Sequence, residues 1–224
     1  MARNIDRDNR DAERRKKQLI DTGFQLFSKN GIEMVSMQKV ADEANVGATT
    51  KYKYLQNKEN LLIAISAKVW GEVWQEALMN PVTNGFDGFT AYQGIEFYAN
   101  LIISLYQNRP ELLRFSSEYK TFITRHGNMN MEDNPLKEHL DVLEPVRNLF
   151  HQMYERAKVD GSVRVDIPEQ ELFTTVAITM LSVAERYSQG LVWADDHNDD
   201  HTRELIYLKE MLLMWCGKKK SIQS

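Results

Sequence analysis

Apolar residues recur at intervals of three or four positions along most of the chain, which is the spacing that places them on one face of an α-helix. The first such segment contains Leu19, Phe24 and Phe27. Gly31 follows it and suits the left-handed backbone position that ends many helices. Residues 1–17 are polar and are expected to form a frayed arm that runs into this first helix.

Two short helices separated by a tight turn are predicted next. Ser36 is a good N-cap for the first helix, whose apolar face would carry Val40 and Ala41. This helix must end near residues 45–47, where Asn and Gly tolerate a positive φ angle. The second helix is expected from about residue 48 to 55. Helices this short are unstable alone in water, so both must pack on their neighbours in a helix-turn-helix arrangement.

The rest of the chain also has a helical pattern. Asn57 is expected to cap a long helix that reaches about Ala77, and the helix-breaking residues 80–88 form a candidate domain junction. A short extended segment is plausible only at 160–168. Further helices are predicted at residues 89–107, 110–125, 136–158 (with a candidate kink at Pro145), 169–193 and 202–216. The pattern therefore predicts an all-α fold, which we divide into residues 1–60 and 61–224.

Composition and charge refine this division. With 42% hydrophobic and 27% charged residues, the chain has the composition of a globular protein with a sizeable core. The net charge of −4 argues against a uniformly basic nucleic-acid binder. Its distribution is uneven, because residues 1–60 hold 12 Lys and Arg against 9 Asp and Glu, while the remainder holds 16 against 23. A mildly basic N-terminal part is thus joined to an acidic remainder.

The sequence suggests a cytoplasmic location. Cys216 is the only cysteine, so neither an intrachain disulfide nor a thiolate metal cluster can form. No apolar run approaches the roughly 20 residues that a membrane span requires. The charged N-terminus also lacks the apolar stretch of a signal peptide. We therefore expect a protein of the reducing cytoplasm without a membrane partner.

Residues 15–62 resemble the DNA-binding domain of the TetR family of transcriptional regulators. The segments that carry the resemblance are LIDTGFQLFSKNG, VSMQKVADEANVG and ATTKYKYLQNKENLL. The sequence departs from the family pattern at four positions, with Gly23 for Ala, Asn45 for Gly, Lys51 for an apolar residue and Leu55 for Phe. The resemblance implies a three-helix, helix-turn-helix DNA-binding domain followed by a helical domain for ligand binding and dimerisation.

The residue types of the second short helix suit DNA. Small residues at its start would let the backbone approach base edges in the major groove, and Thr hydroxyls can bond bases or phosphates. The Tyr52 hydroxyl can donate to a phosphate, and Lys58 begins a helix whose N-terminal amides favour one. A solvated helix face is the alternative. The predicted DNA-binding residues are Ser36, Gln38, Gly47, Ala48, Thr49, Thr50, Tyr52, Lys53, Tyr54 and Lys58, with nonspecific help from the basic residues 14–17.

The acidic remainder is rich in aromatic residues. Buried tyrosines need partners for their hydroxyls, so several of them suggest polar points in an apolar cavity. The resemblance implies a small-molecule pocket in this domain and a mechanism in which the helix of residues 57–77 transmits ligand binding to the DNA-binding heads. Simple core packing is the alternative for each residue. The candidate ligand-binding residues are Trp70, Tyr98, Tyr119, Phe122 and Tyr154.

The last two predicted helices carry apolar residues on more than one face. Such helices can bury one face internally and another against a partner, so we expect them to form a homodimer interface that includes Met180 and Leu212. The segment DDHNDDH at residues 195–201 places His197 and His201 among aspartates and allows a metal hypothesis. An acidic solvated loop before a helix is the favoured interpretation, and neither a metal nor another cofactor is expected.

The predicted function is that of a ligand-responsive transcriptional regulator, a repressor rather than an enzyme. It would bind a pseudo-palindromic operator in double-stranded DNA as a homodimer, and a small apolar or aromatic effector would release it. The alternative is an all-helical enzyme or small-molecule carrier whose N-terminal helices are structural. No Ser-His-Asp order, glycine-rich phosphate loop or HExxH sequence supports that alternative.

Overall fold

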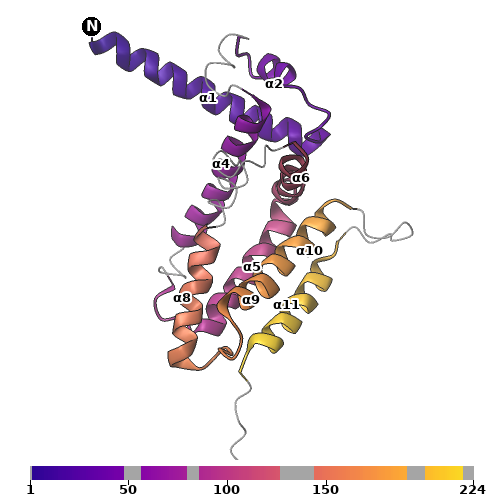
Figure 1. Ribbon diagram of the computed structural model, residues 1–224. Coiled ribbons are helices and arrows are strands. Elements are labelled where there is room, and N and C mark those ends of the chain that lie inside the picture. The colour runs from indigo at the N-terminus through magenta and orange to yellow at the C-terminus, as the bar shows by residue number, and fades with distance from the viewer. Residues whose placement is uncertain (1, 48–56, 80–85, 127–143, 191–199, 219–224) are drawn as a thin grey trace, which may run out of the picture. The chain divides into compact units, whose positions relative to one another are not determined.

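The computed structural model describes residues 2–47, 57–79, 86–126, 144–190 and 200–218, and the regular structure of these residues is helical (Figure 1). An isolated antiparallel bridge between Val163 and Gly217 is the exception. None of the described helices is long and apolar enough to span a membrane. The helices are α1 (Ala2–Asn30), α2 (Met37–Glu43), α4 (Lys58–Met79), α5 (Ala91–Asn108), α6 (Pro110–His126), α8 (Glu144–Asp160), α9 (Glu169–Phe173), a π-helical turn η2 (Thr174–Ile178), α10 (Thr179–Ser188) and α11 (Thr202–Cys216). The predicted all-α class is confirmed.

The predicted ends of the N-terminal helices are confirmed. Helix α1 stops before Gly31, which has a φ of 85°. The Ser36 side chain accepts a hydrogen bond from the Lys39 N–H at the start of α2. Asn45, with a φ of 53°, makes the turn after α2. In the same way, the Asn57 side chain accepts from the Asn60 N–H, at 2.8 Å, and caps α4.

Two other expectations need correction. The polar arm is not frayed, because α1 is helical from Ala2. The helix predicted to reach residue 193 ends at Ser188, and Gly190 with its φ of 69° follows. Residues 136–143 of the predicted helix 136–158 lie outside the described residues, so the candidate kink at Pro145, the second residue of α8, stays a prediction.

The chain divides into two compact units, each built from two stretches of sequence. Unit 1 comprises Met1–Gly71 and Phe115–Val142, and unit 2 comprises Glu72–Arg114 and Leu143–Ser224. Helices α4 and α6 therefore each contribute residues to both units. The division into a DNA-binding part at 1–60 and a ligand-binding part at 61–224 stays a prediction.

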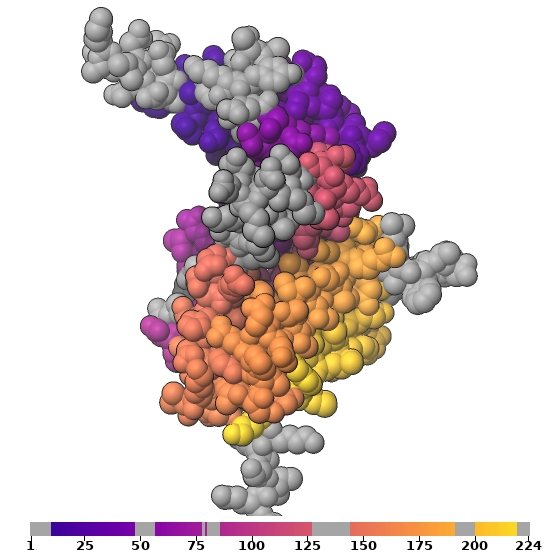
Figure 2. Space-filling model, in the orientation of Figure 1, coloured from indigo at the N-terminus to yellow at the C-terminus, as the bar shows by residue number. Residues whose placement is uncertain are grey.

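Each unit has an apolar core. In unit 1, the core side chains include Leu19, Phe27, Val40, Leu61 and Phe115. In unit 2, α5 packs against α8, α10 and α11. The outer helices of this unit, α8 to α11, form adjoining bands of surface in the space-filling view (Figure 2).

Candidate nucleic-acid interface

Helix α2 and the turn after it present polar and small residues to solvent. Val40 and Ala41 are fully buried, so the opposite side of α2 faces outward. Ser36, Gln38 and Gly47 are exposed. The Gln38 side-chain amide donates to Asp42 Oδ1 at 2.6 Å, one turn further along the helix. These three predicted DNA-binding residues are therefore accessible on one short helix and its turn.

Six of the predicted DNA contacts cannot be compared with the structure in this way. They belong to the second short helix of the expected pair, whose residues lie outside the described ranges. These residues are Ala48, Thr49, Thr50, Tyr52, Lys53 and Tyr54. Their roles stay predictions.

Lys58 begins helix α4, as the sequence predicted, and its position there is supported by aromatic side chains. Its Nζ atom lies 5.7 Å from the centroid of the Phe27 ring and 5.2 Å from that of the Phe122 ring. Burial lowers the pKa of Lys58, while the charges of Glu33 and Glu59 act in the opposite direction. The two rings attract the ammonium group and restrict its position at the start of the helix.

The C-terminal half of α6 supports this region, a role that sequence analysis missed. The Ile32 N–H, just after α1, donates to Glu118 Oε2 at 2.6 Å. His126 Nε2 lies 2.9 Å from Glu33 Oε1. The Phe24 and Phe115 rings pack edge to face with centroids 5.6 Å apart. Helix α6 therefore holds the connection between α1 and α2 in place from within unit 1.

The five candidate ligand-binding residues are not gathered in one compact unit. Trp70, Tyr119 and Phe122 belong to unit 1, and all three are buried there. Tyr98 and Tyr154 belong to unit 2. Core packing explains much of this placement, and a ligand contact by any of the five stays a prediction.

The two candidate ligand-binding tyrosines of unit 2 already have partners for their hydroxyls. Tyr98 is buried and donates to the Ala177 carbonyl at 3.0 Å. Burial, followed by the charge of Glu185, raises its pKa far above the usual value. Tyr154 donates to the Ile167 carbonyl at 2.7 Å. Both hydroxyls therefore bind backbone carbonyls, and the buried Tyr98 needs such a partner.

A hollow of about 400 Å³ lies between α4 and α5 within unit 2. This volume is within the usual range of small-molecule sites. Its residues come from the last turns of α4 and from one side of α5, a pairing that was not apparent from the sequence. They are Val73, Glu76, Ala77, Phe97, Asn100, Leu101, Ser104, Leu105, Asn108 and Arg109.

The described end of the acidic loop has a structural role. Asp200 accepts hydrogen bonds from the Thr202 N–H and hydroxyl at the start of α11, which lower its pKa. The His201 ring is buried and stacks on Tyr187 with centroids 4.5 Å apart. The expectation that the acidic loop leads into a helix is confirmed at Asp200. His197 lies outside the described residues.

Met180 and Leu212 are both buried inside unit 2 and leave little surface for a partner. Their place in a dimer interface stays a prediction. Other apolar residues of η2 and α11 are exposed, and helical spacing alone did not tell them from the buried ones. They are Ile178, Tyr207, Met211 and Met214.

The described part of the site has the features of a helix-turn-helix DNA-binding protein. These are a capped α2, a left-handed turn at Asn45 and a long helix that starts at Lys58. The model of the family described as "Bacterial regulatory proteins, tetR family" matches residues 19–65, which contain these features.

Among known proteins, the chain is 26% identical over 152 residues to the HTH-type transcriptional repressor KstR of Mycobacterium tuberculosis. The match covers 68% of this chain and 62% of the repressor, so it spans less than two thirds of that protein's length. KstR of Rhodococcus jostii is 39% identical over 54 residues, which are 24% of this chain and 26% of that protein.

Solved structures share the fold over most of the chain. A regulatory protein of the tetR family from Rhodococcus RHA1 superposes with a TM-score of 0.66 at 14% identity, covering 92% of this chain and 98% of the other. Residues 19–65 thus match the TetR family, as the resemblance implied, and the fold of the chain is that of a solved regulator of the tetR family. These matches are to transcriptional regulators, so they favour the regulator over the alternative of an all-helical enzyme.

Proposed function

We propose that this protein is a ligand-responsive transcriptional repressor that binds a pseudo-palindromic operator as a homodimer. The observation that carries the proposal is that the polar side of α2 is exposed and that Lys58 stands at the start of α4. Both features lie inside the segment that matches the family. Helix N-termini favour phosphate groups because their free N–H groups and dipoles attract negative charge. The starts of α2 and α4 lie in the same unit, so each could bind a phosphate of the DNA backbone.

Base recognition is assigned to the second helix of the pair. Thr49 and Thr50 would contact base edges, while Tyr52, Lys53 and Tyr54 would contact bases or the backbone beside them. Lys58 and Ser36 would fix the position of the unit on the phosphates. One short helix reads only a few base pairs, so two copies must act together on a two-fold symmetric site.

The effector is proposed to be a small molecule with a large apolar part. A TetR-fold relative, FadR of Bacillus subtilis, was solved in complex with stearoyl-CoA, although it is only 17% identical to this chain, with a TM-score of 0.61 over 88% of this chain and 95% of the other. The hollow between α4 and α5 combines apolar side chains such as Val73 and Leu101 with the guanidinium of Arg109. An acyl chain and an anionic group would find suitable partners there.

Helix α4 is proposed to transmit the effect of effector binding to the DNA-binding residues. Val73 and Ala77 of this helix line the hollow, and Lys58 stands at its first residue. An effector that moves α4 therefore acts on the same element that contacts phosphate. By linkage, the effector must weaken DNA binding by the same factor by which DNA weakens effector binding.

Footprinting on the DNA upstream of the protein's own gene tests the proposal. We expect two protected half-sites whose centres lie about one helical turn apart, and protection that fades when an acyl-CoA probe is added. Lys58→Ala should abolish protection at concentrations where Lys218→Ala, which removes the same charge from an exposed position in unit 2, retains it. Protection of a single half-site, or none by the wild-type protein, would contradict the proposed dimeric repressor.

A further inference from the structure

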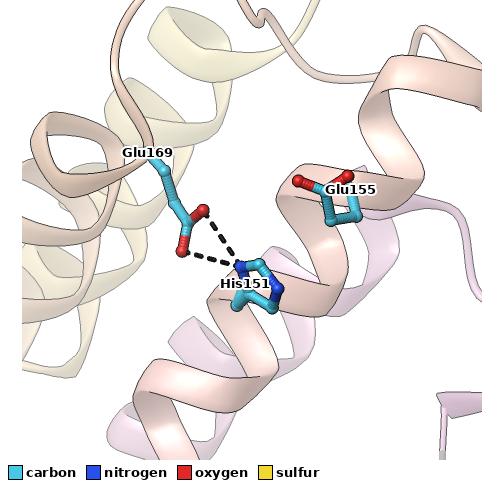
Figure 3. A group of neighbouring side chains, drawn as sticks. All are labelled: His151, Glu155 and Glu169. Atoms are coloured by element: carbon cyan, nitrogen blue, oxygen red, sulfur yellow. Dashed lines mark hydrogen bonds and ion pairs between the residues drawn. The ribbon is translucent and has the colours of Figure 1, made fainter.

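Three potential metal ligands come together in unit 2, whereas the proposed DNA contacts belong to unit 1. His151 and Glu155 lie one turn apart on α8, and Glu169 is the first residue of α9 (Figure 3). His151 Nδ1 lies 3.2 and 3.1 Å from the two carboxylate oxygens of Glu169. One ligand atom from each of the three residues lies within 4.8 Å of the other two.

We propose that His151, Glu155 and Glu169 bind a divalent transition-metal ion of the zinc type. One imidazole and two carboxylates are ligands that zinc accepts, and two carboxylates balance the charge of a divalent cation. Three protein ligands leave a fourth position for water, as in open zinc sites. The His-x-x-x-Glu spacing places two of the ligands on the same face of α8.

The three ligand atoms could reach the separations of a zinc site by side-chain movement alone. Zinc–ligand bonds of about 2.0–2.2 Å in a tetrahedral arrangement place ligand atoms about 3.3–3.6 Å apart. His151 and Glu169 already meet this separation to within a few tenths of an ångström. Glu155 has to approach further, and it is exposed, so a change of rotamer is sufficient.

The backbone around the site is held in position independently of a metal. The Tyr154 hydroxyl donates to the Ile167 carbonyl, which ties the segment before α9 to α8. The Phe150 and Phe173 rings pack edge to face at 5.5 Å and join the same two helices below the surface. Glu169 therefore faces His151 through a fixed framework, which lowers the entropic cost of assembling the ligands.

A hollow beside His151 and Glu169 gives room for the fourth ligand. It has a volume of about 190 Å³ and includes the buried rings of Phe150 and Phe173 on its wall. Two cations oppose a metal here. Arg147 lines the same hollow, and Lys158 forms an ion pair with Glu155 at 2.5 Å. The hydrogen bond from Lys158 also lowers the pKa of Glu155.

Lys158 competes with the metal for Glu155. The effect of removing Lys158 therefore distinguishes a metal site from a simple cluster of ion pairs. Titration calorimetry of the whole protein with zinc chloride should show one site per chain that His151→Ala and Glu169→Gln each weaken about tenfold or more. Glu155→Gln should weaken it as well. Lys158→Ala should instead strengthen zinc binding severalfold, because Glu155 is then released to the metal.

His126→Ala is the matched control, since His126 also pairs with a glutamate, Glu33, at 2.9 Å, and no third metal ligand gathers there among the described residues. This variant should bind zinc as the wild type does. Cobalt(II) should give the intense visible absorption of a four-coordinate ion in the wild type and in His126→Ala, and lose it in His151→Ala. Zinc affinity unchanged by both His151→Ala and Glu169→Gln, or absent in the wild type, would overturn the proposal.

Discussion

At the scale of single residues, Gly94 shows how closely α8 packs against α5. A Cβ atom added at Gly94 would lie 2.0 Å from Met153 Sδ, so the side chain of Met153 occupies the space that any larger residue would need. Gly71, in α4, is the opposite case, because an added Cβ would meet no atom within 4 Å among the described residues. The same residue type therefore has a packing role at one position and none at the other.

Gly94→Ala is expected to lower the free energy of unfolding by roughly 1–3 kcal/mol, because the methyl group overpacks the α5–α8 contact. Gly71→Ala should raise it by about 0.5–1 kcal/mol, because alanine restricts the unfolded chain and favours helix. Urea unfolding followed by circular dichroism measures both. Equal effects of the two substitutions would show that helix propensity, rather than the contact with Met153, decides the role of Gly94.

At this scale, the sequence could predict contacts between residues that are close together in the chain, but not contacts between distant ones. The caps at Ser36 and Asn57 act on backbone groups three residues away, so local residue preferences were sufficient to find them. The bond from the Ile32 N–H to Glu118 joins residues 86 positions apart. The group of His151 and Glu169 requires α9 to turn back on α8. Such contacts depend on tertiary packing, which residue spacing in a single sequence does not reveal.

At the scale of elements, α11 shows a similar limit to what the sequence can predict. Its bounds, Thr202–Cys216, agree with the prediction because the apolar pattern begins and ends there. The pattern also indicated more than one apolar face, but it could not tell which face is internal. Leu212 is buried, whereas Met211 and Met214 are 67% and 76% exposed. Exposed methionines beside Tyr207 form a surface suited to a second copy of the chain.

Met211→Asp is therefore expected to dissociate the proposed homodimer while the helices remain folded, because a charge would be desolvated and unpaired at the interface. Met180→Asp should unfold unit 2 instead, since Met180 is fully buried in one chain. Sedimentation velocity and circular dichroism separate the two results. Val159→Asp is the control, because Val159 is 90% exposed on α8. If Met211→Asp sediments like the wild-type dimer, the interface lies elsewhere.

At the scale of the whole molecule, two helices connect the proposed activities. Helix α4 contributes Lys58 to unit 1 and Val73 to unit 2, and α6 contributes Glu118 to unit 1 and Leu112 to unit 2. The capped start and long apolar pattern of α4 were visible in the sequence, whereas its role in transmission was implied by the family resemblance and stays a prediction. The sequence did not predict the role of α6, since the connection made by Glu118 is a long-range hydrogen bond.

The central claim is that Lys58, at the start of α4, contacts DNA phosphate in each of two symmetric heads. The most direct measurement is the salt dependence of DNA affinity, determined by fluorescence anisotropy with a duplex from the upstream region and with an unrelated duplex. Lys58→Ala should weaken binding to both duplexes and reduce the slope of log affinity against log salt by about two units per dimer, because each head then neutralises one phosphate fewer. Lys218→Ala should leave the slope unchanged. If Lys58→Ala has the affinity and the slope of the wild type, Lys58 does not contact DNA and the proposed interface is wrong.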